Sequence, residues 1–190
     1  MSVSYKGKKI SLPVIAYGGM VHSNYMMGMI SLVNKLASLG VNVTCPSIWF
    51  ESLISRARNA SAAAALSNED DYLMFIDTDV IFNANDVIKL LDADKDVAVG
   101  LYPKKYINNQ KVQFLSKKYS EMPAFWRELV GDFSSEFDNK VFKNNESLIE
   151  VNYAATGFML IKTSVFKTIA DKKPDLKYKN DIDGYMSYGD

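Results

Sequence analysis

The order of short apolar runs and longer helical segments is the feature that most constrains the fold of this chain. Between residues 10 and 100 the two kinds of segment alternate. The apolar runs predict strands at 10–17, 41–45, 71–76 and 95–100, and the helical patterns predict helices at 25–40, 51–67 and 83–94. This β-α-β-α-β-α-β order predicts an α/β fold with a mostly parallel sheet and helices on both of its faces.

The composition narrows the class of protein. The chain has 190 residues, which favours one domain spanning 1–190. Its 22 basic and 22 acidic side chains cancel, so nothing indicates a basic face for nucleic acid. Cys45 is the single cysteine, which excludes an internal disulfide and fits a reducing compartment. No apolar run approaches the ~20 residues that a membrane span needs, so we expect a cytoplasmic protein without a membrane span.

The pattern changes after Gly100. Residues 101–120 are basic and irregular, and residues 121–137 have room for one short helix. A loop, a strand at 158–161 and a helix at 164–170 follow, and the chain ends in a polar segment.

Two carboxylates follow the apolar run 72–76 in the stretch DYLMFIDTDVIF. In parallel α/β sheets, ligands bind beyond the carboxyl ends of the strands, where Asp77 and Asp79 would lie. Residues i and i+2 of an extended segment point the same way, so the two side chains could converge on one hard cation such as Mg²⁺ or Mn²⁺. A strand followed by a polar turn, with Asp77 capping backbone amides, would give the same pattern. Placing two anions beside a buried strand is costly unless something compensates them, which favours a binding site.

Other polar and small residues lie at comparable positions in the pattern. Arg56 and Arg58 fall at or just inside the start of a predicted helix, where they would bind phosphate or carboxylate, or simply form a solvated face. Gly18 and Gly19 follow the first strand, where they would let a backbone approach a ligand or form a plain turn. Gly157 precedes the last predicted strand and has the same two interpretations.

Four segments, SRARN, YLMFIDTDVIF, DVAVGLYPKK and YAATGFMLIK, resemble in this order and spacing a glycosyltransferase of the GT-A fold. More specifically, they resemble the family-2-like glycosyltransferases of phages, large viruses and bacteria. The resemblance covers residues 10 to 170. It implies a nucleotide-binding half, 1–100, an acceptor-side half, 101–190, and, for a viral protein, a location in the host cytoplasm.

The resemblance also implies a chemistry. A sugar would pass from a nucleoside-diphosphate sugar, such as a UDP- or GDP-sugar, to a hydroxyl of a glycan acceptor. Mn²⁺ or Mg²⁺ at the pair Asp77 and Asp79 would neutralise the leaving diphosphate. Asp79 would bind the metal directly, and Asp77 would contact the ribose or a metal-bound water. The donor-binding residues that the resemblance implies are Tyr17, Gly18, Gly19, Arg56, Arg58, Asp77, Thr78, Lys104 with its neighbour Lys105, Thr156 and Gly157.

The chain departs from the family pattern near its end. Related transferases carry a late acidic pair, which supplies the general base of inverting enzymes, and some carry a late histidine that binds the metal. Here the single histidine is His22, in the first loop. Asp183 and Asp190, together with Asp181, are candidates for the base by location only.

Two other functions remain open on the sequence. In a haloacid-dehalogenase-type phosphohydrolase, Asp77 would be the nucleophile and Asp79 the general acid and base. That motif usually opens its domain, whereas two β-α units precede it here. Alternatively, the chain is a non-catalytic domain that binds a nucleotide sugar without transferring it.

Overall fold

The computed structural model describes residues 5–121, 126, 130–133, 135–136 and 148–178. The chain divides into two compact units, one formed by residues 1–100 and 156–190 and the other by residues 101–155. The first boundary coincides with the change of sequence pattern after Gly100, and the expected second half is divided between the two units.

The first unit contains a five-stranded sheet in the order β3-β1-β5-β9-β6. Its strands are β1 (Lys9–Ser11), β3 (Asn42–Thr44), β5 (Tyr72–Ile76), β6 (Val97–Val99) and β9 (Phe158–Lys162). Strand β9 runs antiparallel to both of its neighbours, whereas β1 runs parallel to β3 and β5. The structure therefore confirms the predicted α/β class with a mostly parallel sheet.

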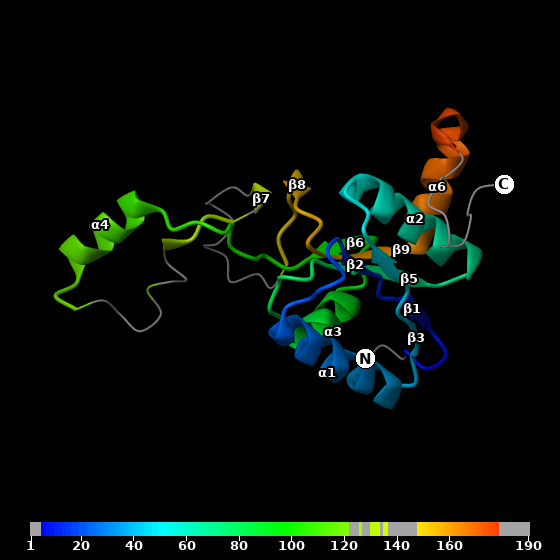
Figure 1. Cartoon of the computed structure of the whole chain (residues 1–190), viewed down its shortest axis with the longest axis horizontal. Helices are drawn as coiled ribbons and strands as arrows, with labels where there is room; N and C mark the ends of the chain where they lie inside the picture. The colour runs from blue at the N-terminus through cyan, green and yellow to red at the C-terminus, as the bar shows by residue number, and fades with distance from the viewer. Residues whose placement is uncertain (1–4, 122–125, 127–129, 134, 137–147, 179–190) are drawn as a thin grey trace. The chain divides into compact units, whose positions relative to one another are not determined.

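Helices cover both faces of this sheet, as predicted. They are α1 (Ser23–Ser38), α2 (Ile54–Ser67), α3 (Ala84–Asp92) and α6 (Thr163–Lys172), followed by the 3₁₀ helix η2 (Pro174–Leu176). Figure 1 shows α1 and α3 on one side of the sheet and α2 and α6 on the other, and each of these two pairs is in contact. None of the helices within the described ranges combines the length and the apolar character that crossing a bilayer requires.

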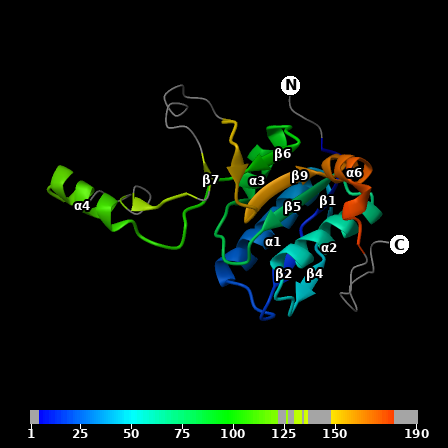
Figure 2. The ribbon, with the colours of Figure 1, turned by 90° about the horizontal axis from the view of Figure 1, so that it is seen from above.

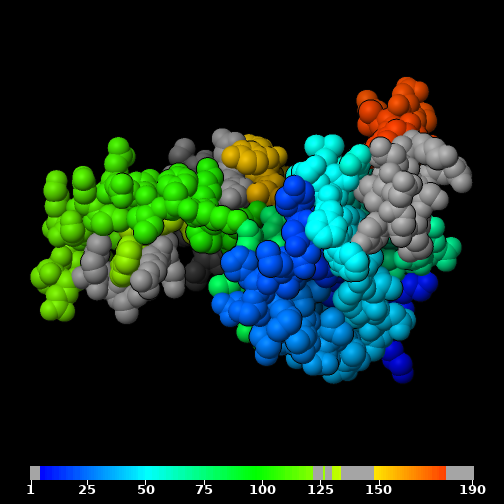
Figure 3. Space-filling view, in the orientation of Figure 1, coloured from blue at the N-terminus to red at the C-terminus, as the bar shows by residue number. Residues whose placement is uncertain are grey.

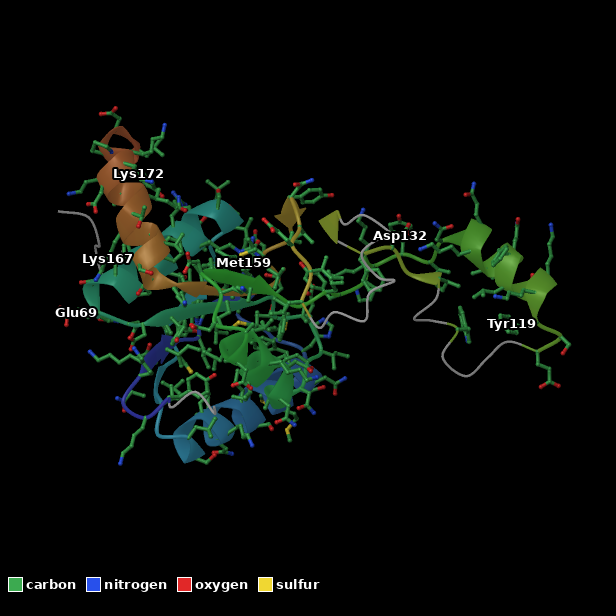
Figure 4. All side chains as sticks on the ribbon, turned by 180° about the vertical axis from the view of Figure 1, so that it is seen from behind. Glu69, Tyr119, Asp132, Met159, Lys167 and Lys172 are labelled. Atoms are coloured by element: carbon green, nitrogen blue, oxygen red, sulfur yellow. The ribbon has the colours of Figure 1, made fainter. Side chains whose placement is uncertain are left out.

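Strand β5 lies at the centre of the sheet and of the core. It pairs with β1 on one edge and with β9 on the other, as Figure 2 shows from above. Its residues Leu73 to Ile76 are buried, and because side chains alternate along a strand, they fill both faces. Leu73 and Phe75 pack in one cluster with Ala65 of α2 and with Met159, which Figure 4 labels on β9.

The predicted strand 10–17 is wrong as a single strand. It is interrupted after β1, and β2 (Val14–Ala16) pairs in parallel with β4 (Ser47–Trp49) in a separate two-stranded sheet. Pro13 lies at the interruption, where its ring removes a backbone donor from the ladder. Strand β4 itself was not predicted. The predicted end of α1 is confirmed, because Gly40 has a φ of +75° just beyond the last helical turn.

The second unit contains a helix where the sequence predicted irregular structure. Helix α4 (Asn109–Lys118) begins after Asn108, whose side chain accepts hydrogen bonds from the backbone of residues 110 and 111. Asp132, labelled in Figure 4, accepts hydrogen bonds from Tyr106 and Asn108 and pairs with Lys111 at 2.8 Å. The Lys111 ammonium and these two donors hold the pKa of Asp132 well below its usual range.

The same unit contains a short antiparallel pair of strands, β7 (Ser135–Glu136) and β8 (Tyr153–Ala154). The short helix expected within 121–137 lies largely outside the described residues.

Gly28 fixes the position of the segment that follows the two aspartates. It lies in the buried face of α1, and a Cβ atom there would approach the Phe82 ring to 2.9 Å. That ring is itself held between Tyr25, at a centroid distance of 6.1 Å, and Phe158, at 5.7 Å. Since the ring is packed on both sides, it has little freedom to move away.

We predict that Gly28→Ala lowers the free energy of unfolding by about 1 kcal/mol, and by at most about 2 kcal/mol, measured by urea denaturation. Overpacking typically costs 1–3 kcal/mol, and the ~1 kcal/mol that alanine contributes through helix propensity offsets part of this cost. Ser31→Ala, on the exposed side of the same helix, is the control and should stay within about 0.5 kcal/mol of the wild type. A Gly28→Ala protein as stable as the wild type would show that Phe82 does not fix this segment.

Candidate functional site

The candidate site lies where the direction of the strand order reverses. From β1 the chain passes through α1 to β3 on one side, and then through α2 to β5 on the other side of β1. The strands β1 and β5 are parallel neighbours, so their carboxyl ends face the same edge. In open α/β sheets this switch point is the usual position of a ligand. Asp77, Thr78 and Asp79 follow β5 directly and lie at this edge.

An ion pair joins α2 to the end of β5. Arg58 Nη2 lies 2.7 Å from Asp77 Oδ1, and both side chains are half-buried. The guanidinium carbon of Arg58 also lies 5.7 Å from the centroid of the Phe75 ring, a cation–π arrangement. Its Nε atom is buried and has no acceptor among the described residues. Asp77 therefore does not exhaust the hydrogen-bonding capacity of Arg58, and both charges are held at a fixed position.

Backbone hydrogen bonds bring three distant segments to the same place. The Asp77 amide donates to the Gly157 carbonyl at 2.8 Å, and the His22 amide donates to the Thr78 carbonyl at 3.2 Å. The loop before α1, the segment after β5 and the segment before β9 are thus linked. The structure brings together Asp77, Thr78, Arg58 and Gly157 from the predicted set, and the bond from His22 links the loop that contains Gly18 and Gly19.

The loop between β2 and α1 is exposed and tightly turned. Gly19 has a φ of +68° and its amide donates to the Ala16 carbonyl at 2.9 Å, so the turn that the sequence offered as one of two interpretations is present at this position. Tyr17 is exposed, and its carbonyl accepts from the Phe50 amide at 3.0 Å. Gly18, which follows Tyr17, is exposed as well. This loop can present backbone groups to a ligand at the carboxyl edge.

Arg56 has a different partner from Arg58. Its Nε atom donates to Glu51 Oε2 at 2.7 Å, and the other carboxylate oxygen of Glu51 accepts from the Leu53 amide at 2.7 Å. The Glu51 side chain is buried at the start of α2. The Arg56 guanidinium and the Leu53 amide lower the pKa of this carboxyl group. Arg56 thus stabilises the start of the helix through Glu51, whereas Arg58 is paired with Asp77.

Tyr25 is a buried residue of this region that the sequence interpretation did not identify. Its hydroxyl has no hydrogen-bond partner among the described residues. Burial raises the pKa of Tyr25 to about 12, with smaller contributions from Cys45 and Asp77. The phenol therefore lies within electrostatic range of the candidate site. Its place in the helical apolar pattern of α1 predicted only a core residue.

The carboxylates of Asp77 and Asp79 could supply some, but not all, of the ligands that a hard divalent ion needs. Within the described ranges, no group of three or more His, Cys, Asp or Glu side chains is arranged to bind a metal ion. Mg²⁺ commonly takes one or two carboxylates together with substrate phosphates and waters. Because Arg58 already neutralises part of the charge of Asp77, the residues fit a cation that binds with a diphosphate better than a cation bound alone.

The remaining predicted residues lie elsewhere. Thr156 is half-buried and directly precedes Gly157 in the first unit. Lys104 and Lys105 belong to the second unit, where the Lys104 amide donates to the Asp132 carbonyl at 2.7 Å. The candidate bases Asp183 and Asp190 lie outside the described residues, as does Asp181.

No protein-family profile matches this sequence, and no curated protein sequence matches it significantly. A function for this chain is therefore inferred from the geometry and chemistry of its own residues.

We predict that Glu51→Gln lowers the melting temperature at neutral pH and that this difference disappears in acid. The folded pKa of Glu51 is lowered, so its stabilising contribution is present above its ordinary pKa of 4.5 and is lost as the pH falls through the folded value. Thermal unfolding of both proteins at neutral pH and at successive values below 4.5 measures this.

Glu150→Gln, at an exposed position, is the control and should match the wild type throughout. A difference between Glu51→Gln and the wild type that is equal at every pH would show that the loss does not depend on the charge of the Glu51 carboxylate.

Proposed function

We propose that this chain binds a nucleoside-diphosphate sugar together with Mn²⁺ or Mg²⁺ and transfers the sugar to a hydroxyl of a glycan acceptor. The observation that supports this most directly is the pairing of Asp77 with Arg58 at the carboxyl end of β5. A diphosphate is an anion, and it can be stabilised by a metal ion held by carboxylates together with an arginine that donates to phosphate oxygens. The carboxylates and the arginine lie at the strand edge where ligands of α/β sheets bind.

In this proposal each residue has a separate task. Asp79 is exposed and binds the metal ion, while Asp77 orients Arg58 and contacts the ribose or a metal-bound water. The Tyr17–Gly19 loop offers backbone groups to the nucleotide. When bound, the metal ion stabilises the negative charge that develops on the leaving diphosphate.

The Arg58 ion pair favours this function over a phosphohydrolase that uses Asp77 as its nucleophile. A nucleophilic carboxylate has to reach a phosphorus atom, whereas one Asp77 oxygen is held at 2.7 Å by Arg58. Trapping of a phosphoryl-aspartate analogue by fluoroberyllate at Asp77 would reverse this preference.

Asp79→Ala should abolish metal-dependent donor binding and leave the fold intact, because it removes the exposed carboxylate that the metal needs. Isothermal titration with UDP, GDP and their common sugar conjugates, first with Mn²⁺ and then with EDTA, measures the effect. Asp171→Ala, which removes an exposed carboxylate from α6, is the matched control and should bind like the wild type. Undiminished binding by Asp79→Ala would exclude the metal role of this residue.

Arg58→Ala should weaken donor affinity by about 1.5–3 kcal/mol, the range for hydrogen bonds to charged groups. Arg56→Ala is the matched control, because it lies in the same helix but pairs with Glu51, and its donor affinity should change little. The same titrations, corrected for the folded fraction by circular dichroism, separate the two arginines. Equal losses in both variants would mean that the start of α2, and not a phosphate contact, controls affinity.

A further inference from the structure

Residues 10–50 carry almost no charge. Lys35 is the single Asp, Glu, Lys or Arg side chain in this segment, although such residues make up 23% of the whole chain. At that average, these 41 residues would hold about nine. The segment contributes to the four strands β1 to β4, but it also forms the loop before α1 and the whole of α1, which reach the surface together with the end of β4.

The same segment and the residues just after it expose large apolar side chains. Met20 is 80% exposed and Phe50 is 76% exposed. The exposed set, called the apolar face below, consists of Tyr17, Met20, Val21, Met26, Met27, Ile30, Trp49, Phe50, Leu53 and Ile54. In Figure 3 the blue segment before and within α1 and the cyan segment after β4 lie side by side on the face toward the viewer.

Hydrogen bonds and close contacts confirm that the apolar face is continuous. The Phe50 amide donates to the Tyr17 carbonyl, and a Cβ on Gly19 would lie 3.9 Å from the Phe50 ring. On α1, Met26 and Met27 precede Ile30 by four and three residues and so lie on one side of the helix. These contacts join the loop to the segment after β4, and the loop leads directly into α1, so the three parts together form the apolar face.

We infer that the apolar face binds a second copy of this chain in a symmetric homodimer. Large exposed apolar patches mark interaction sites, and interface cores are enriched in Met and aromatic residues and depleted of Lys, Glu and Asp, as this face is. A fully exposed large side chain offers about 150–250 Å², so ten that are about half exposed offer up to roughly 1,000 Å². A stable interface needs about 800 Å² per partner.

The lack of charge selects a second copy as the partner. In a two-fold interface the same surface meets itself, so a net charge on it faces the same net charge on the partner. A face without Asp, Glu, Lys or Arg avoids this repulsion completely, since Arg56 and Glu51 nearby neutralise each other. Binding to an anionic membrane or to an acidic partner would instead need basic side chains on the face, and it has none.

Sedimentation equilibrium of the full chain over a wide concentration range tests the inference. We expect a wild-type dimer and at least an approximately 100-fold weaker association in Met27→Glu, which places a carboxylate at a 60% exposed position of α1. Phe50→Asp should have the same effect, and aspartate tolerates the φ of +55° at this position. Ile169→Glu is the matched control, an apolar helix position 48% exposed on α6, and should dimerise like the wild type.

Circular dichroism of all three variants shows whether each is folded. A wild-type chain that stays monomeric at every concentration overturns the inference, and so does a dimer that persists in both Met27→Glu and Phe50→Asp. Loss of the dimer only in Ile169→Glu would place the interface elsewhere. A monomer that sediments with phosphatidylcholine vesicles would assign the face to a membrane and would also overturn the inference.

Discussion

Burial of β5 on both faces determines where this chain can carry charge. Its four residues from Leu73 to Ile76 are enclosed between α1 and α3 on one side and α2 and α6 on the other, so a charged side chain at any of these positions would be very costly. The first position free of this constraint is the end of the strand, where Asp77 lies. Because β1 and β9 flank β5, the carboxylate is also at the centre of the sheet edge. The burial of β5 in the core therefore determines where the candidate site lies.

The Arg58–Asp77 pair makes this position chemically specific. An isolated half-buried carboxylate beside an apolar strand would be costly, and the guanidinium at 2.7 Å compensates it. The same guanidinium stacks near Phe75, so the core residue, the cation and the carboxylate form one connected unit. Arg56 pairs with Glu51, so two arginines that lie two residues apart in one helical turn have different charged partners.

The sequence predicted the elements whose signals are local. The apolar run 71–76 and the helical patterns 25–40 and 83–94 were predicted, and the structure confirms them as β5, α1 and α3. The break at Pro13 and the strand β4 depend on which distant segment supplies the partner strand, so three-residue runs did not reveal them. Helix α4 is short and polar, and its cap, Asn108, is its clearest signal. Of the site, the sequence identified the acids and Arg58, but not the hydrogen bond from the Asp77 amide to Gly157, since that contact joins positions 80 residues apart.

The candidate site and the apolar face share one structural element, the loop from Tyr17 to His22. Its His22 amide is bonded to Thr78, beside the two aspartates, and its Tyr17 carbonyl is bonded to Phe50, in the apolar face. Ordering this loop has a cost in conformational entropy. When a partner has already ordered the loop, this cost no longer reduces the affinity of a ligand at the site. Since linkage is reciprocal, a ligand that orders the loop strengthens association by the same factor. Under both proposals, dimerisation through the apolar face and nucleotide binding at the edge of β5 would therefore be thermodynamically coupled through the six residues of this loop, of which Tyr17 belongs both to the apolar face and to the part offered to the nucleotide.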